Sequence, residues 1–131
     1  MSRENLEVVR RAMAAWNSGD LDDLIAELVD PHVDFVPAAE SLMAAAYHGY
    51  DGVRRFRADL FSAWDEYALG DLEFVDADDQ VVVVTRVRAR TREIEIDQVW
   101  SVLITVRDGR ITRFQGFTSR DGALEAVGLR E

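Results

Sequence analysis

Two arginines on one predicted strand are the side chains of this chain best suited to bind an anion. In the stretch VVVVTRVRAR, Arg86 and Arg88 stand two residues apart, and alternate residues of a strand lie on the same face of its sheet. Their planar guanidinium groups can bind a carboxylate or a phosphate through two parallel hydrogen bonds. Alternatively, they pair with acidic residues of the protein, such as Glu40, Glu95 or Asp97, or extend into solvent.

The next predicted strand begins with two more polar candidates, Asp97 and Gln98. If Trp100, Val102 and Ile104 face the interior, the alternation of the strand turns Gln98 inward and Asp97 outward. Gln98 is then a candidate ligand contact, with a solvated strand end as the alternative. Asp97 is also considered as a catalytic acid.

The two histidines are the remaining candidates for proton transfer. His48 follows Tyr47 ahead of a predicted helix, and an imidazole titrates near neutral pH, so His48 can act as an acid or a base. The alternative is an ordinary loop residue. His32 directly follows Pro31 and is the weaker candidate for an acid or a base. Because no metal-ligand spacing is visible, the sequence predicts no metal site and no cofactor.

The composition excludes several kinds of chemistry. The chain has no cysteine and no lysine, and all 15 basic residues are arginine, so thiolate and Schiff-base catalysis are both excluded. A net charge of −10 disfavours nucleic acid and anionic membranes as partners, because both are bound by cationic surfaces. The use of arginine alone, with abundant alanine, valine, aspartate and glycine, indicates a bacterium with a GC-rich genome.

The length of 131 residues predicts one domain, residues 1–131, that can bury a core without disulfides. The apolar runs are too short to cross a membrane. The N-terminal segment MSRENLEVVRR lacks the apolar core of a signal peptide, so we expect a cytoplasmic location.

The N-terminal elements are predicted from apolar spacing and end signals. An amphipathic helix over 4–17 ends at Gly19, because glycine readily takes the left-handed conformation that follows a helix. A second short helix starts at Asp20 and ends at Pro31, and a strand follows at 33–37.

The central segment contains a third predicted helix. Residues 38–50 fit either a helical turn or a flap, and Asp51 then caps the helix. Its apolar face carries Val53, Phe56, Leu60, Trp64 and Tyr67. Arg54, Arg55 and Arg57 lie largely on the opposite face.

The rest of the chain has the period of a sheet. Strands are predicted at 71–76, 80–91, 95–106 and 110–118, followed by a short helix at 120–129. Short loops join the strands, so the sheet is mostly antiparallel and the fold class is α+β. Such a twisted sheet, wrapped around the helices, leaves a hollow that can hold a ligand.

Four segments in this order resemble one family. They are Trp16–Asp30, His48–Phe56, Thr105–Phe114 and Ser119–Leu129, and they are similar to the nuclear transport factor 2-like proteins of the SnoaL-like and ketosteroid-isomerase-like branch. The resemblance implies a cone-shaped, curved, mostly antiparallel sheet wrapped around three N-terminal helices, the cystatin-like fold. This fold hosts isomerases, cyclases, hydrolases, dehydratases and binders without catalysis.

The resemblance also allows a residue-by-residue comparison with the isomerases. Their tyrosine corresponds to Ala12, and their first aspartate corresponds to Phe35. Their second aspartate corresponds to Val102, or to Ser101 if the gap in the alignment is placed one residue away. The chain therefore lacks the base and the oxyanion donors of that mechanism. The pattern of limonene-epoxide hydrolases, an arginine flanked by two aspartates, is not recognisable either.

By the same resemblance, the face that carries Arg86 and Arg88 is the concave, pocket-facing one. The expected ligand-binding residues are mostly aromatic or aliphatic, with ordinary core packing as the alternative: Trp16, Phe35, Tyr47, Phe56, Leu60, Trp64, Arg86, Arg88, Gln98, Trp100, Val102 and Phe114. An acidic lid residue, Glu40, is a further candidate. Aromatic walls suit a flat apolar ligand.

The family commonly pairs through the outer, convex face of the sheet, so a homodimer is expected. That face is predicted to carry Val83, Thr85, Val87, Val99, Ser101 and Leu103. Two functions remain open. The first is binding of a small apolar ligand that can carry an anionic group. The second is a cofactor-independent isomerase, cyclase, dehydratase or hydrolase, in which Arg86 polarises an oxyanion and a water or His48 moves the proton.

Overall fold

The computed structural model describes residues 2–38 and 46–128. Its elements in chain order are α1 (Ser2–Ser18), α2 (Leu21–Leu28), β1 (Val29–Val36), β2 (Tyr47–His48), α3 (Gly49–Ala63), β3 (Glu66–Ala77), β4 (Gln80–Arg90), β5 (Glu95–Arg107), β6 (Arg110–Phe117) and α4 (Gly122–Ala126). The candidate lid residue Glu40 lies outside the described residues. Within them, no helix is long and apolar enough to cross a membrane.

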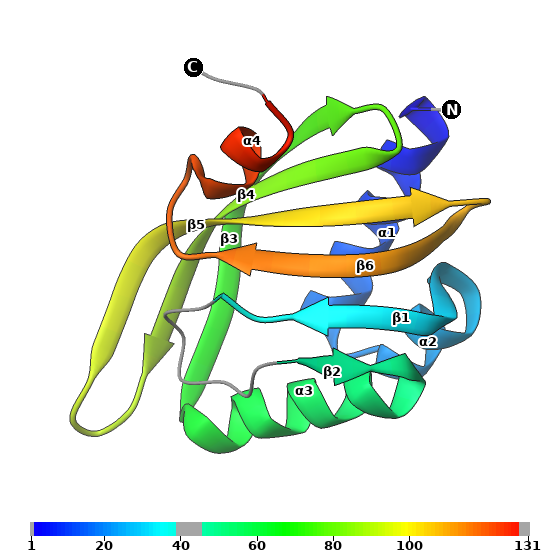
Figure 1. Cartoon of the computed structure of the whole chain (residues 1–131). Coiled ribbons are helices and arrows are strands. Elements are labelled where there is room, and N and C mark those ends of the chain that lie inside the picture. The colour runs from blue at the N-terminus through cyan, green and yellow to red at the C-terminus, as the bar shows by residue number, and fades with distance from the viewer. Residues whose placement is uncertain (1, 39–45, 129–131) are drawn as a thin grey trace.

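The strands form one mixed sheet in the order β2-β1-β6-β5-β4-β3 (Figure 1). β1 and β6 are parallel, and every other neighbouring pair is antiparallel. The antiparallel run from β3 to β6 follows from short turns, in which Asp78, Asp108 and Gly109 take positive φ angles of 67°, 52° and 76°. The α+β prediction with a mostly antiparallel, curved sheet is confirmed.

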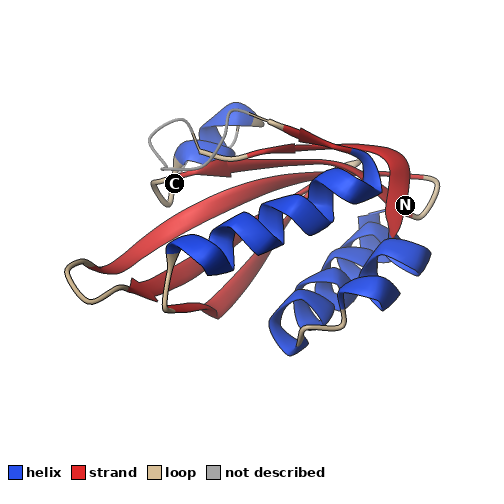
Figure 2. Ribbon diagram, turned by 90° about the horizontal axis from the view of Figure 1, so that it is seen from below, coloured by secondary structure: helices blue, strands red, loops and turns tan. Residues whose placement is uncertain are grey.

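The helices α1, α2 and α3 lie on one side of the curved sheet, which we call the inner face (Figure 2). α3 runs across this face, and α1 and α2 lie side by side next to it. The main core joins Val9 and Met13 of α1 to Leu24 of α2 and to Ile104 of β5. Burial of each such side chain contributes about 1.5–3 kcal/mol, so apolar packing holds the helices against the sheet.

The opposite, outer face is covered at one end by α4. Val82, Val84 and Leu103 pack there against Ala123 and Leu124. Both faces of β4 are therefore buried along its first half, because Val81 and Val83 belong to the inner core.

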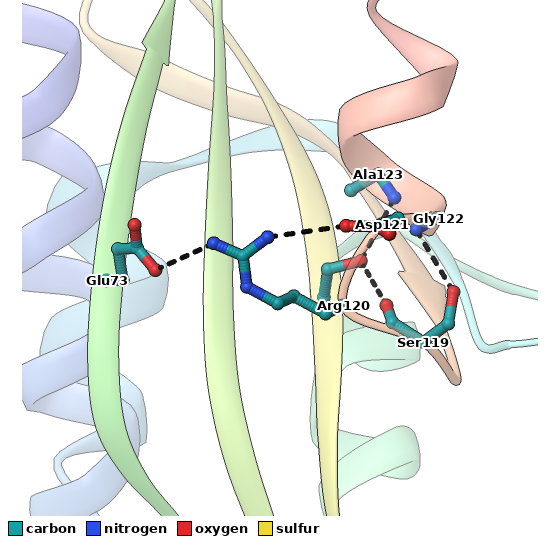
Figure 3. Close-up of polar contacts among 7 residues, drawn as sticks. Glu73, Ser119, Arg120, Asp121, Gly122 and Ala123 are labelled. Atoms are coloured by element: carbon teal, nitrogen blue, oxygen red, sulfur yellow. Dashed lines mark hydrogen bonds and ion pairs between the residues drawn. The ribbon is translucent and has the colours of Figure 1, made fainter. Parts of the chain in front are cut away.

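Hydrogen bonds fix the segment before α4 to the outer face (Figure 3). The Ser101 hydroxyl donates to the carbonyl of Ser119 at 2.7 Å and accepts from the backbone N–H of Ala123 at 3.0 Å. Arg120 lies 3.6 Å from Glu73 of β3, and the two form an ion pair. Ser101 is fully buried, so its two hydrogen bonds to this segment are shielded from water, whereas the Arg120–Glu73 ion pair is partly exposed.

Three predicted boundaries were wrong. The third helix ends at Ala63, and β3 starts at Glu66 rather than at residue 71. Trp64 already has extended backbone angles (φ −123°, ψ 135°), so Tyr67 lies on a strand and not on the helix. Pro31 does not end the second helix but lies inside β1, where the register with β6 is irregular and a missing backbone N–H costs little.

Candidate ligand site

A cavity of about 490 Å³ lies between the inner face of the sheet and the helices α1 and α3. α1 contributes Ala12, Met13 and Trp16, and α3 contributes Phe56 and Leu60. Strand residues form the remaining walls. The cavity borders the main core, because four of its lining residues also belong to that core: Ala12, Met13, Leu24 and Phe114.

Nine of the twelve expected ligand-binding residues line this cavity: Trp16, Phe35, Phe56, Leu60, Trp64, Gln98, Trp100, Val102 and Phe114. Several of their rings are in contact. The centroid of Phe35 lies 4.3 Å from that of Phe56 and 4.5 Å from that of Phe114. This aromatic wall offers flat apolar surface to a ligand.

The arginine pair is not in the cavity, and its predicted orientation was wrong. The register of β4 with β5 puts Arg86 opposite Val99 and Arg88 opposite Asp97 on the outer face. The inner face instead carries Thr85 and Val87. The alternation of the strand correctly put both arginines on one face, but the choice of that face as the inner one came from the family resemblance and was wrong.

Asp97 partners the arginines, as the alternative interpretation held. Arg86 donates from Nε to Oδ1 at 2.6 Å and from Nη2 to Oδ2 at 2.9 Å, and Arg88 Nε lies 3.8 Å from Oδ1. The hydrogen bond from Arg86 lowers the pKa of Asp97. Asp97 is thus a charged carboxylate on the outer face, a position that does not suit a catalytic acid for this cavity.

Tyr47 and His48 lie behind the cavity wall rather than in it. His48 is exposed and lies 2.9 Å from Asp34, between Nδ1 and Oδ1. The Tyr47 hydroxyl donates to Asp59 at 2.7 Å, and its ring meets Phe56 edge-on at 5.4 Å. Across residues 2–38 and 46–128, no three His, Asp or Glu side chains converge as a metal site would require.

The polar groups in the cavity are neutral. Tyr67 and Thr85 line it together with Gln98, and the described lining contains no Asp, Glu, His or Arg. Burial raises the pKa of Tyr67 to about 12, so its hydroxyl stays protonated at neutral pH and can donate. The Thr85 hydroxyl donates to Gly70 O at 2.9 Å, and Gln98 Oε1 accepts from Trp100 Nε1 at 2.8 Å.

The sequence analysis missed Tyr67 and Thr85 as site residues. Tyr67 was assigned to a helix, and the alternation that starts at Glu66 is the signal that could have placed it on a strand. Thr85 was assigned to the outer face together with Val87. Ala12, Phe35 and Val102, which correspond to the catalytic residues of the isomerases, all line the cavity, so this chain has apolar groups there.

The fold and this cavity are those of a SnoaL-like domain, and the chain belongs to that family, whose sequence profile matches residues 9–114. It is 36% identical over 124 residues to the uncharacterized protein Rv0034 of Mycobacterium tuberculosis, an alignment that covers 93% of this chain and 94% of the relative.

Solved structures support the same assignment at the level of the fold. A nuclear transport factor 2-like protein of Burkholderia xenovorans has a TM-score of 0.79 and 21% identity, covering 98% of each chain. TerC, co-crystallised with polyporic acid, has a TM-score of 0.77 and 20% identity over 95% of this chain and 98% of TerC. The predicted nuclear transport factor 2-like fold is therefore confirmed, and the predicted SnoaL-like family is confirmed by the profile match.

Proposed function

We propose that this protein, as a single SnoaL-like domain, binds a small organic molecule whose flat, apolar and uncharged body fills the inner cavity. The observation that carries the proposal is the lining. It is formed by aromatic and aliphatic side chains, and its described members include no charged group. Burial of a charge without a partner is costly, so the lining selects for a neutral body.

Three neutral polar groups support orientation of that body. The Tyr67 hydroxyl has no hydrogen-bond partner among the described residues and is a free donor toward a carbonyl or hydroxyl. The Thr85 hydroxyl donates its hydrogen bond to the Gly70 carbonyl, so its oxygen can accept a hydrogen bond from a ligand. Gln98 lies at an exposed strand end and can form a hydrogen bond with a polar substituent of the ligand near the cavity mouth.

Binding is a better-supported function than turnover. A protonated tyrosine can polarise a carbonyl, but acid–base catalysis also needs a group that takes up a proton. The described lining supplies no carboxylate and no imidazole for that step. TerC, which shares the fold and was co-crystallised with polyporic acid, supports a small organic molecule as the kind of ligand.

A matched pair of probes tests the proposal. We expect 2-acetylnaphthalene, which is neutral, to bind with 1:1 stoichiometry and at least about tenfold more tightly than 2-naphthoate, whose carboxylate sits directly on the ring. The reason is that the described part of the cavity wall offers no cation to a compact anion. Quenching of tryptophan fluorescence reports binding, because all three tryptophans of the chain line the cavity.

The outcomes separate the proposal from its alternatives. Failure of 2-acetylnaphthalene to bind would contradict it, as would tighter binding of 2-naphthoate. Conversion of the probe is not expected, and the recovered molecule should be chemically unchanged.

We also propose a homodimer through the part of the outer face that α4 leaves uncovered. The predicted surface needs correction, because Val83 lies in the inner core, Thr85 and Val87 line the cavity, and Ser101 and Leu103 lie under α4. Val99 supports the proposal, since 43% of this apolar residue is exposed.

Sedimentation equilibrium tests this interface. The wild type should sediment at twice the chain mass of 14.8 kDa. Val99→Arg should shift it toward the monomer, because two added charges would face each other across a twofold axis. A wild type that sediments at the monomer mass would contradict the dimer.

A further inference from the structure

A second, smaller cavity adjoins the proposed ligand site. It has a volume of about 300 Å³ and shares Trp16, Tyr67 and Leu69 with the large cavity. Unlike the large cavity, it contains a charged side chain, Arg57 of α3. The two spaces therefore differ in chemistry on either side of a wall formed by Trp16 and Tyr67.

Arg57 is held in a defined geometry rather than extended into solvent. Its guanidinium carbon lies 4.8 Å from the ring centroid of Trp16 and 4.6 Å from that of Phe61. Nη1 donates to the Trp16 carbonyl at 2.9 Å. The prediction that Arg57 lies with Arg54 on the face opposite the apolar one is wrong, because the side chain is half-buried and packs between the ends of α1 and α3.

Among the residues that the structure describes, no carboxylate pairs with the Arg57 guanidinium. In the described part of the chain, none of the ion pairs includes Arg57, whereas Arg54 on the same helix approaches Asp22 at 3.6 Å and Asp51 at 3.7 Å. A guanidinium has five N–H donors, and only one of those of Arg57 is used by a described residue. Burial lowers the pKa of Arg57, as expected for a cation partly removed from water without an opposite charge.

We propose that the Arg57 cavity is an acid-binding subsite of the large cavity. The ligand is then an apolar aromatic molecule that carries a carboxylate on a flexible tether. The ring system fills the large cavity, the tether passes Trp16 and Tyr67, and the carboxylate accepts hydrogen bonds from Arg57. This inference depends on the proposed function, since it assigns the class of molecule that the same site binds.

The geometry explains why the tether is required. A carboxylate placed directly on the ring would lie among the apolar side chains of the large cavity, where no described residue is charged. A carboxylate a few methylenes away can leave that environment and reach Arg57, whose stacked position between Trp16 and Phe61 fixes the direction of its free N–H groups.

The test compares 1-pyrenebutyrate with 1-pyrenebutanol, which share the ring and tether and differ in charge. In the wild type we expect the acid to bind about tenfold more tightly than the alcohol, the usual scale of one charge-assisted contact. Arg57→Gln should bring the two affinities within about twofold of each other without weakening the alcohol. Arg55→Gln, which removes an exposed arginine of the same helix, is the matched control and should keep the wild-type preference.

A measurement on the unaltered protein covers the case in which Arg57→Gln fails to fold. In the wild type, pyrenebutyrate should shift the Arg57 Nε–H signal in the nitrogen-15 spectrum, and pyrenebutanol should not. Equal affinities for acid and alcohol in the wild type, an unchanged preference in Arg57→Gln, or an unmoved Arg57 signal would overturn the subsite while leaving the proposed function intact. If neither pyrene compound nor 2-acetylnaphthalene binds, both proposals fail together.

Discussion

Replacement of Val87 by tryptophan should weaken binding of 2-acetylnaphthalene by roughly 100-fold, or about 2.7 kcal/mol. Val87 is 1% exposed and lies between Thr85 and Ala89 on the cavity side of β4. An indole at this position must project into the space that the ligand ring would occupy. Fluorescence titration measures the loss, and a thermal melt followed by circular dichroism verifies that the variant is folded.

The matched control is Val99→Trp, the same substitution on the outer face of the neighbouring strand. Val99 lies opposite Arg86 and does not line the cavity, so its replacement should leave the affinity within about twofold of the wild type. Equal loss of binding in both variants would show that the probe does not sit in the inner cavity. Retention of full affinity by a folded Val87→Trp protein would show the same.

Replacement of Ile104 by alanine should lower the free energy of unfolding by about 3–4 kcal/mol. Ile104 is fully buried and belongs to the core that joins α1, α2 and the inner face of the sheet. The truncated side chain loses its transfer free energy and leaves a void that close-packed neighbours fill only in part. Urea denaturation at equilibrium gives the difference.

Ile94→Ala is the control for this core prediction. Ile94 is 50% exposed in the turn between β4 and β5, so the same truncation should change stability by less than about 0.5 kcal/mol. A loss of similar size at both positions would mean that residue 104 is not in a packed core. Loss of binding should follow Ile104→Ala only where the protein unfolds, because this residue does not line the cavity.

The faces of β5 could be predicted from the sequence, and those of β4 could not. Along β5, Gln98, Trp100 and Val102 alternate with Asp97, Val99 and Ser101, and the bulky apolar side chain of Trp100 indicates which of the two faces is the inner one. The structure agrees, since all three line the cavity.

Along β4, the run Val81–Val84 is buried on both faces, because α4 covers the outer side where the other helices cover the inner one. Apolar character therefore carries no information about which face is inner. The position of Arg86 depended on that choice, and it became clear only from the register of β4 with β5.

Arg57 shows a second limit of sequence-based prediction. The helical period in fact puts Arg57 beside Val53 and Leu60, at spacings of four and three residues, so its predicted place on the opposite face was wrong. Val53 and Leu60 are both buried. The period cannot reveal that the end of α1 approaches that flank of α3, so that Trp16 provides a ring and a carbonyl for the guanidinium. Contacts between elements distant in sequence set the chemistry of this subsite.

The central claim is that an uncharged apolar body binds inside the cavity, and the indole N–H signals of Trp16, Trp64 and Trp100 test it most directly. These three are the only tryptophans of the chain, and all line the cavity. Titration of the nitrogen-15-labelled protein with 2-acetylnaphthalene should move all three signals with one dissociation constant and saturate at one molecule per chain. Unmoved indole signals, with shifts confined to backbone amides of the outer face such as those of Arg86 and Val99, would contradict the claim.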